Sequence, residues 1–112
     1  NRITPPMVQQ MSAAELKGLR DASQELVLLD VREPWELAIA HLSHTLDIPM
    51  NELPDRLQEI PRDRPVVVMC RSGARSLQVA HFLEQQQFSP VANLAGGILA
   101  WGEAFDPGLH RY

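Results

Sequence analysis

The sequence contains one cysteine in 112 residues, and this scarcity excludes an internal disulfide. It has no CxxC pair and no grouping of histidine with cysteine at ligand spacing, which argues against a structural metal site. No apolar run approaches the roughly 20 residues that a membrane-spanning helix requires. The formal net charge is -4, so the chain lacks the basic surface typical of nucleic-acid-binding proteins. These absences predict a cytoplasmic protein without a metal, a membrane partner or a nucleic-acid partner.

The first ten residues also lack the apolar core of a signal peptide. The chain does not begin with Met, which is typical of a trimmed chain or of a piece of a longer protein. Apolar residues make up 45% of the sequence and charged residues 21%, as in ordinary globular proteins. The length suits a single core, so we expect one domain over residues 1–112.

Short apolar runs alternate with helical patterns along the chain. Strands are expected at 26–31, 45–49, 65–70 and 90–94, and helical segments at 12–22, 32–41, 50–60, 74–88 and 96–105. Ser12 and Glu15 form a capping-box pattern, and Pro34 falls in the first turn of its helix. Leu77, Ala80, Phe82 and Leu83 are expected to form the apolar stripe of the helix over 74–88. The alternation predicts an α/β fold with a mainly parallel central sheet of about five strands flanked by helices on both faces.

The only cysteine, Cys70, ends the strand with the most β-branched residues and opens the segment CRSGARS. In parallel sheets, sites form at the carboxyl ends of the strands. Gly73 permits a tight turn with positive φ, after which the amides of residues 71 to 76 can converge on one point. The helix that follows adds the positive end of its dipole. The candidate anion-binding residues are therefore Arg71, Ser72, Gly73, Ala74, Arg75 and Ser76.

Every one of these features stabilises a negative charge at the centre of the loop and so lowers the pKa of the Cys70 thiol. The planar fork of Arg75 suits a tetrahedral oxyanion, and Arg71 adds a second positive charge at the rim. The alternative is an ordinary buried thiol at the end of a strand, because free cysteine is often buried. The arginines, the glycine and the start of a helix favour a reactive thiolate.

Four motifs in order resemble those of single-domain rhodaneses, which are sulfurtransferases. An apolar strand leads into Asp30 and Arg32, HLSHTLDIP follows, then the cysteine loop, and last NLAGGILAW. The chain departs from the family pattern at Ala40, where glycine is usual, and at His44 and Thr45, which replace a Gly-Ala pair. The ending FDPGLHRY resembles rhodanese domains fused behind ubiquitin-activating-like enzymes that load sulfur carriers, which indicates a fusion or a sulfur-relay partner.

The resemblance implies that Cys70 takes a sulfane sulfur from thiosulfate or a protein persulfide and passes it to cyanide or a thiol, with no cofactor beyond the covalent persulfide. It also implies that the amides of the loop cradle this persulfide and that Arg75 holds the sulfonate of the donor. Phosphatases and arsenate reductases on the same fold have one more residue between cysteine and arginine, so the spacing here favours sulfur chemistry. A rhodanese-like module that binds an anion or a partner without turnover is the other alternative.

Asp30 and Arg32 are expected to be structural, with Asp30 bonded to nearby amides and Arg32 paired with Glu36 across a helical turn. His41 is expected to satisfy a buried polar contact. Trp35 is expected to pack or to line the rim of the site.

Overall fold

The computed structural model describes residues 8–112, in which five strands form one parallel sheet in the order β1-β5-β4-β2-β3. Residues 1–7 lie outside the described part. The expectation that the first ten residues form no signal peptide falls mostly on them. The strands are β1 (Gln9–Met11), β2 (Val27–Asp30), β3 (Leu46–Asp47), β4 (Val66–Met69) and β5 (Val91–Leu94). The predicted α/β class with a parallel sheet of about five strands is confirmed.

Within the described residues, four α-helices and two 3-10 helices follow or connect the strands. They are α1 (Ala13–Asp21), α2 (Pro34–Ile39), η1 (Met50–Asp55), η2 (Leu57–Glu59), α3 (Ala74–Gln85) and α4 (Gly97–Phe105). The capping box at α1 is present, with the Glu15 amide donating to Ser12 Oγ at 3.0 Å and the Ser12 amide to Glu15 Oε1 at 2.9 Å. In the described residues 8–112, no helix combines the length and apolarity that a bilayer crossing requires.

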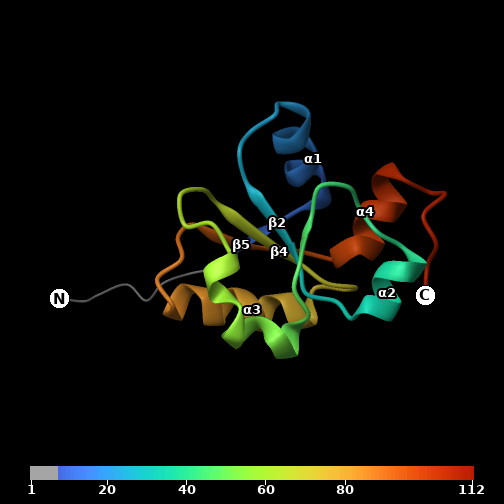
Figure 1. Cartoon of the computed structure of the whole chain (residues 1–112). Helices are drawn as coiled ribbons and strands as arrows, with labels where there is room; N and C mark the ends of the chain where they lie inside the picture. Colours follow the sequence, from blue (N-terminus) through green and yellow to red (C-terminus); the bar gives the residue numbers. More distant parts are fainter. Residues whose placement is uncertain (1–7) are drawn as a thin grey trace.

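Helices cover both faces of the sheet, as predicted (Figure 1). Alternating side chains of β2 separate the two cores: Val27 and Leu29 pack with α3 and the 3-10 segment, whereas Leu28 packs with α1 and α4. The predicted stripe of α3 is partly wrong, because Val79, Ala80 and Leu83 are buried while Leu77 and Phe82 are only half-buried.

The register of the two central strands positions the site. Asp30 lies opposite Met69, so the chain leaves β2 and β4 side by side at the same edge of the sheet. The loop at 70–73 and the loop before α2 therefore adjoin, and α3 and α2 begin directly after them. The carboxyl ends of the central strands thus bring together the cysteine loop and the Asp30–Arg32 segment.

Candidate active site

Cys70 immediately follows β4 and is 1% exposed beneath a short surface loop. Ser72 and Ala74 on that loop are exposed to solvent. Gly73 has a φ of +108°, which a residue with a side chain rarely adopts, and α3 begins at the next residue. The left-handed turn is what reverses the chain so that the first amides of α3 approach the sulfur.

Three donors converge on the Cys70 sulfur. The Gly73 amide lies 3.1 Å from Sγ, the Ser76 amide 3.4 Å and the Ser76 hydroxyl 3.3 Å. Burial by itself raises the pKa of the Cys70 thiol, but donors from Ser76, Gly73 and Ser72 outweigh burial and bring the pKa below its usual value. The loop therefore turns the Gly73 and Ser76 amides, two of the amides named by the prediction, toward the sulfur, and these donors favour a thiolate over an inert buried thiol.

The start of α4 holds the loop from behind. The Ile98 amide donates to the Cys70 carbonyl at 2.9 Å, and the Leu99 amide donates to the Arg71 carbonyl at 3.2 Å. A Cβ on Gly97 would lie 2.5 Å from the Cys70 carbonyl oxygen and 2.3 Å from that of Arg71. Gly97 thus permits the close approach of α4 to the loop, and amides of α4 bond two of the carbonyls of the loop.

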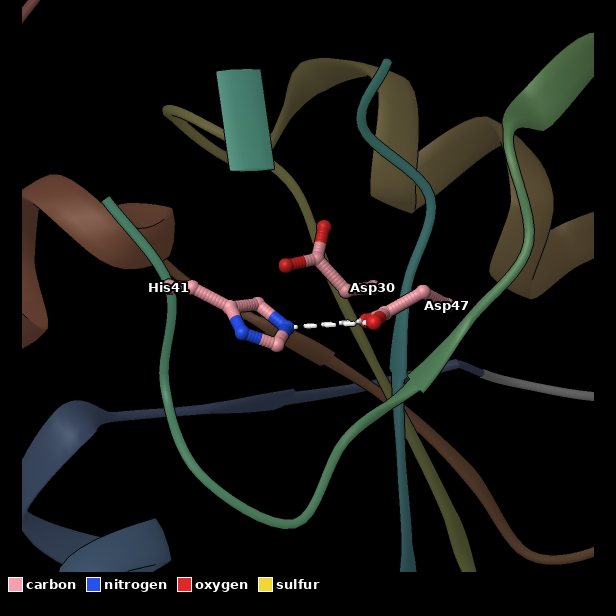
Figure 2. A group of neighbouring side chains, drawn as sticks. All are labelled: Asp30, His41 and Asp47. Carbon is pink, nitrogen blue, oxygen red and sulfur yellow. Dashed lines mark hydrogen bonds and ion pairs between the residues drawn. The ribbon is translucent and has the colours of Figure 1, made fainter. Parts of the chain in front are cut away.

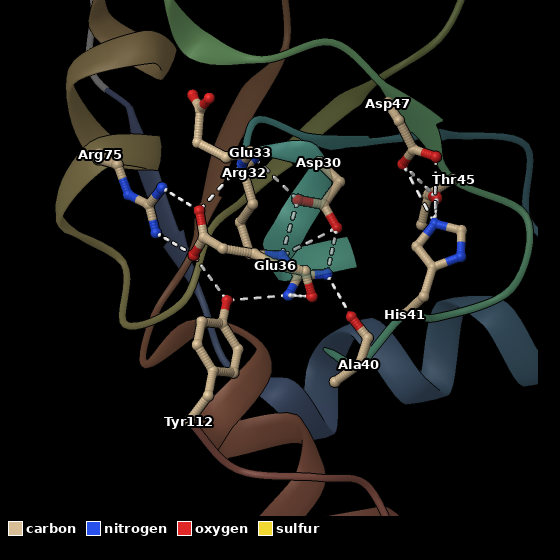
Figure 3. Close-up of polar contacts among 10 residues, drawn as sticks. All are labelled: Asp30, Arg32, Glu33, Glu36, Ala40, His41, Thr45, Asp47, Arg75 and Tyr112. Carbon is tan, nitrogen blue, oxygen red and sulfur yellow. Dashed lines mark hydrogen bonds and ion pairs between the residues drawn. The ribbon is translucent and has the colours of Figure 1, made fainter. Parts of the chain in front are cut away.

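Arg75 extends from α3 to α2, where it forms a two-point ion pair with Glu36 at 2.7 and 2.8 Å (Figure 3). The Arg75 hydrogen bond is the main cause that lowers the pKa of Glu36 to about 2, and the Tyr112 hydroxyl also donates to Glu36, at 2.7 Å. The positive charge of Arg75 also acts on the Cys70 sulfur through space. The buried Glu36 carboxylate therefore fixes the guanidinium of Arg75, the residue that was expected to hold the sulfonate of the sulfur donor.

Arg71 is half-buried and turns toward the end of the described chain. Its Nε lies 2.6 Å from the main-chain oxygen of Tyr112, its terminal nitrogen also contacts that oxygen, and its guanidinium lies over the tyrosine ring. The two arginines of the segment thus have different partners: Arg71 contacts a main-chain oxygen, whereas Arg75 pairs with a carboxylate.

Asp30 and Arg32 form a fully buried ion pair with an N–O distance of 2.8 Å. Asp30 also accepts from the Arg32 amide at 3.1 Å, as expected of a carboxylate that bonds a nearby amide. The predicted pairing of Arg32 with the Glu36 side chain is wrong (Figure 3): Arg32 donates to the main-chain oxygens of Glu36 and Ala40 and to the Tyr112 hydroxyl. Arg75 reaches Glu36 instead, because α3 begins beside α2.

His41 lies nearby but is exposed, so the expected buried contact is wrong. Its ring nitrogen bonds to Asp47 (Figure 2) and to Thr45 (Figure 3). Asp30, His41 and Asp47 present ligand atoms within 4.8 Å of one another. However, the Asp30 carboxylate is engaged by Arg32, and Asp47 accepts from Thr45 and His41. Contacts within the protein account for all three side chains, and we assign no metal to them. Trp35 is 61% exposed on α2 and packs edge-on against Tyr112, so it lies at the rim of this network.

Two residues of the site were missed by sequence reasoning. Asn93 in β5 is 3% exposed and lies beside Ser76, and Tyr112 joins Arg32 to Glu36. A polar residue within the apolar run VANL was a usable signal for Asn93, because a buried amide needs partners. No local pattern marked Tyr112, whose partners lie 76 and 80 residues away.

Comparison with known proteins gives one consistent result. The family model described as Rhodanese-like domain matches residues 12–104. A sulfurtransferase of Allochromatium vinosum is 42% identical over 95 residues, which cover 85% of this chain and 89% of that protein. The adenylyltransferase and sulfurtransferase MOCS3-2 of Zea mays is 30% identical, and the match covers 96% of this chain and 24% of that protein.

Solved structures agree with the sequence matches. A rhodanese-related protein from Thermoplasma volcanium is 32% identical with a TM-score of 0.79, and the match covers 87% of this chain and 93% of that one. A rhodanese-like domain protein from Staphylococcus aureus is 30% identical with a TM-score of 0.81, covering 94% of this chain and 99% of that one.

Proposed function

Because this chain belongs to the family of rhodanese-like domains, whose relatives include sulfurtransferases, we propose that it transfers a sulfane sulfur through a persulfide on Cys70. The observation that carries the proposal is the convergence of the Gly73 amide, the Ser76 amide and the Ser76 hydroxyl on a sulfur at the end of β4. These donors would stabilise the thiolate that attacks and the thiolate that later leaves.

In the first half-reaction the Cys70 thiolate attacks the outer sulfur of thiosulfate. A new S–S bond forms to Cys70, the S–S bond of the donor breaks, and sulfite leaves with the electron pair. A protein persulfide would serve as donor in the same way, with its cysteine thiolate as the leaving group. No cofactor enters either version, because the cysteine itself carries the sulfur.

In the second half-reaction cyanide or a thiolate attacks the terminal sulfur of the persulfide. The Cys70 thiolate departs with the electron pair, and the same three donors receive its charge. The Gly73 and Ser76 main-chain amides are suited to both halves because they point at the sulfur before any substrate binds, and we propose that the other amides from Arg71 to Ser76 contribute to the same cradle. Asp30 and Arg32 would act as support, since their buried pair fixes the segment next to the loop.

We propose that Arg75 recognises the sulfonate end of the donor, with a smaller contribution from Arg71. The Arg75 side chain is 35% exposed, so an anion can reach it while Glu36 holds the other side. The four-residue spacing between Cys70 and Arg75 supports a sulfur substrate over phosphate or arsenate. We propose a protein donor or acceptor of a sulfur relay as the physiological partner; the Zea mays relative, whose name combines an adenylyltransferase with a sulfurtransferase, supports a role within a larger protein.

The test is the intact mass of the protein after incubation with thiosulfate. We expect a gain of one sulfur atom that cyanide removes, and no gain in Cys70→Ser. Slower loading in Arg75→Ala than in Arg71→Ala supports the assignment of the clamp, whereas equal rates contradict it. A protein that gains no sulfur from thiosulfate or from a persulfide donor, yet still binds anions at the loop, is a binding module and refutes the proposal.

A further inference from the structure

The buried amide of Asn93 has its orientation fixed by two acceptors. Its Nδ2 donates to Gln10 Oε1 at 3.0 Å and to the Gly73 carbonyl at 3.3 Å. The Gly73 carbonyl can only accept, so the nitrogen of the Asn93 amide must face it, and the Gln10 side-chain amide presents its oxygen to the same nitrogen. The carbonyl oxygen Oδ1 consequently faces Ser76, which lies on the first turn of α3.

Ser76 stands between this oxygen and the cysteine. Its Oγ lies 2.5 Å from Asn93 Oδ1 and 3.3 Å from Cys70 Sγ. An amide oxygen cannot donate, so the short contact requires that Ser76 donates to Asn93. A serine hydroxyl has one proton, and it cannot be given to Asn93 and to the sulfur at the same time.

We propose that Asn93 is a positioning residue that competes with the Cys70 sulfur for the single hydroxyl proton of Ser76. While Cys70 is a thiol, its S–H donates to a lone pair of Ser76 Oγ, and the Ser76 hydroxyl donates to Asn93. When the thiol ionises, its proton leaves to solvent and the Ser76 hydroxyl turns toward the sulfur anion. Asn93 Oδ1 then loses its donor in a buried position, and this loss opposes ionisation.

The other groups around the sulfur are independent of this competition. The Gly73 and Ser76 amides donate to Sγ whichever way the hydroxyl points. Among the charged side chains around the loop, Arg75 pairs with Glu36, Arg32 pairs with Asp30, and Arg71 contacts the Tyr112 oxygen. Asn93 bonds to none of these charged side chains, but its Nδ2 donates to the Gly73 carbonyl, so the Ser76→Ala background is needed to separate the effect on the hydroxyl from any movement of the loop.

The consequence for sulfur transfer rests on the function proposed above. A thiolate becomes a weaker nucleophile as its pKa falls, and the most effective attacking thiol has a pKa near the ambient pH. Three donors and a nearby arginine would push the pKa of Cys70 down. Asn93 limits the fall of the Cys70 pKa and so keeps the thiolate a stronger nucleophile.

The test is the pH dependence of Cys70 alkylation by iodoacetamide, which reports the apparent pKa of the thiol. In Asn93→Ala we expect that pKa to fall by about half a unit to one unit, because Ser76 is free to serve the thiolate. Ser76→Ala raises the pKa. Asn93→Ala produces no further shift in the Ser76→Ala background. Gln10→Ala is the matched control, because Gly73 still orients the amide, and its pKa equals that of the wild type.

A rise or no change in Asn93→Ala, or an equal shift with and without Ser76, overturns the proposal. Far-UV circular dichroism checks that each variant is folded. If Asn93→Ala does not fold, Asn93→Asp retains the size of the side chain and holds the Ser76 proton more strongly; it must raise the pKa, and by less in the Ser76→Ala background. The titration uses no sulfur donor, so its outcome is separate from that of the sulfur-loading test.

Discussion

At the scale of single residues, Gly97 has the least freedom to change. It lies where the start of α4 meets the cysteine loop, with a φ of +62°, and a Cβ there would lie 2.3 Å from the Arg71 carbonyl oxygen. The atoms that this Cβ would meet belong to the main chain of Cys70 and Arg71, and they cannot move aside without moving the loop. The amides that stabilise the Cys70 sulfur thus depend on the absence of one methyl group.

We expect Gly97→Ala to lower the free energy of unfolding by at least about 2 kcal/mol, through strain and overpacking. Gly18→Ala is the matched control, because Gly18 lies within α1 with open space around its Cα. That change should raise stability by about 0.5 to 1 kcal/mol. Urea denaturation of both variants measures the difference, and a Gly97→Ala protein as stable as the wild type would contradict the packing described here.

At the scale of elements, one ion pair joins α2 to α3 across the mouth of the site. Glu36 is buried and its carboxylate receives both terminal nitrogens of Arg75 as well as the Tyr112 hydroxyl. Since Glu36 also accepts from the Glu33 amide, the same carboxylate caps α2. The positions of two helices therefore depend on one ionised group.

The pKa of Glu36 is about 2 in the folded protein against 4.5 for the free side chain, so ionisation stabilises the fold above pH 4.5. That stabilisation disappears as the pH falls toward 2. We expect Glu36→Gln to lose about 2 kcal/mol of unfolding free energy at pH 7, a figure reduced for the partial exposure of Arg75, and much less near pH 2.

Urea unfolding at a series of pH values measures this difference. Glu103→Gln is the control, because Glu103 pairs with Arg111 at 3.2 Å on the surface, where both side chains are more than half exposed. Removing that pair should change stability by less than about 0.5 kcal/mol at any pH. A Glu36→Gln deficit that stays constant down to pH 2 would show that the ionisation of Glu36 is not the source of the stabilisation.

At the scale of the whole molecule, the parallel sheet carries a core on each face. Leu83 of α3 belongs to one cluster and Leu16 of α1 to the other, and both side chains are 0% exposed. The two clusters share the backbones of β2, β4 and β5, whose alternating side chains contribute to both. Loss of either cluster therefore exposes the strands that support the other.

We expect Leu83→Ala and Leu16→Ala each to cost about 2 to 4 kcal/mol and to leave one cooperative unfolding transition. Trp101 packs against the cluster that contains Leu16, whereas Trp35 is exposed, so tryptophan fluorescence follows that face. In Leu83→Ala the fluorescence transition should coincide with the far-UV circular dichroism transition. Ile39→Ala, at an exposed position, is the control, and separate transitions would mean that the two faces unfold independently.

The sequence alone was sufficient for the local backbone features that depend on close neighbours, although it predicted the wrong partner for Arg32 and part of the wrong stripe on α3. Buried strands, the Ser12–Glu15 capping box, Pro34 at the start of α2 and the turn at Gly73 follow from patterns a few residues long. The convergence of the loop amides on Cys70 belongs with them, because its donors lie three to six residues from the sulfur. The three-residue strand β1 was missed because its sequence QQM has no apolar pattern, and β3 is shorter than the strand predicted at 45–49.

The tertiary structure decided what partners the polar side chains find. Arg75 meets Glu36 from 39 residues away, Asn93 meets Ser76 from 17 and Gln10 from 83, and Tyr112 meets Arg32 from 80. These pairs form because the parallel sheet gathers the ends of separate strands at one edge, and no local periodicity encodes such a meeting. The sequence by itself therefore determined the candidate sulfur and the turn of its loop, whereas the side chains that surround that sulfur come together only once the chain is folded.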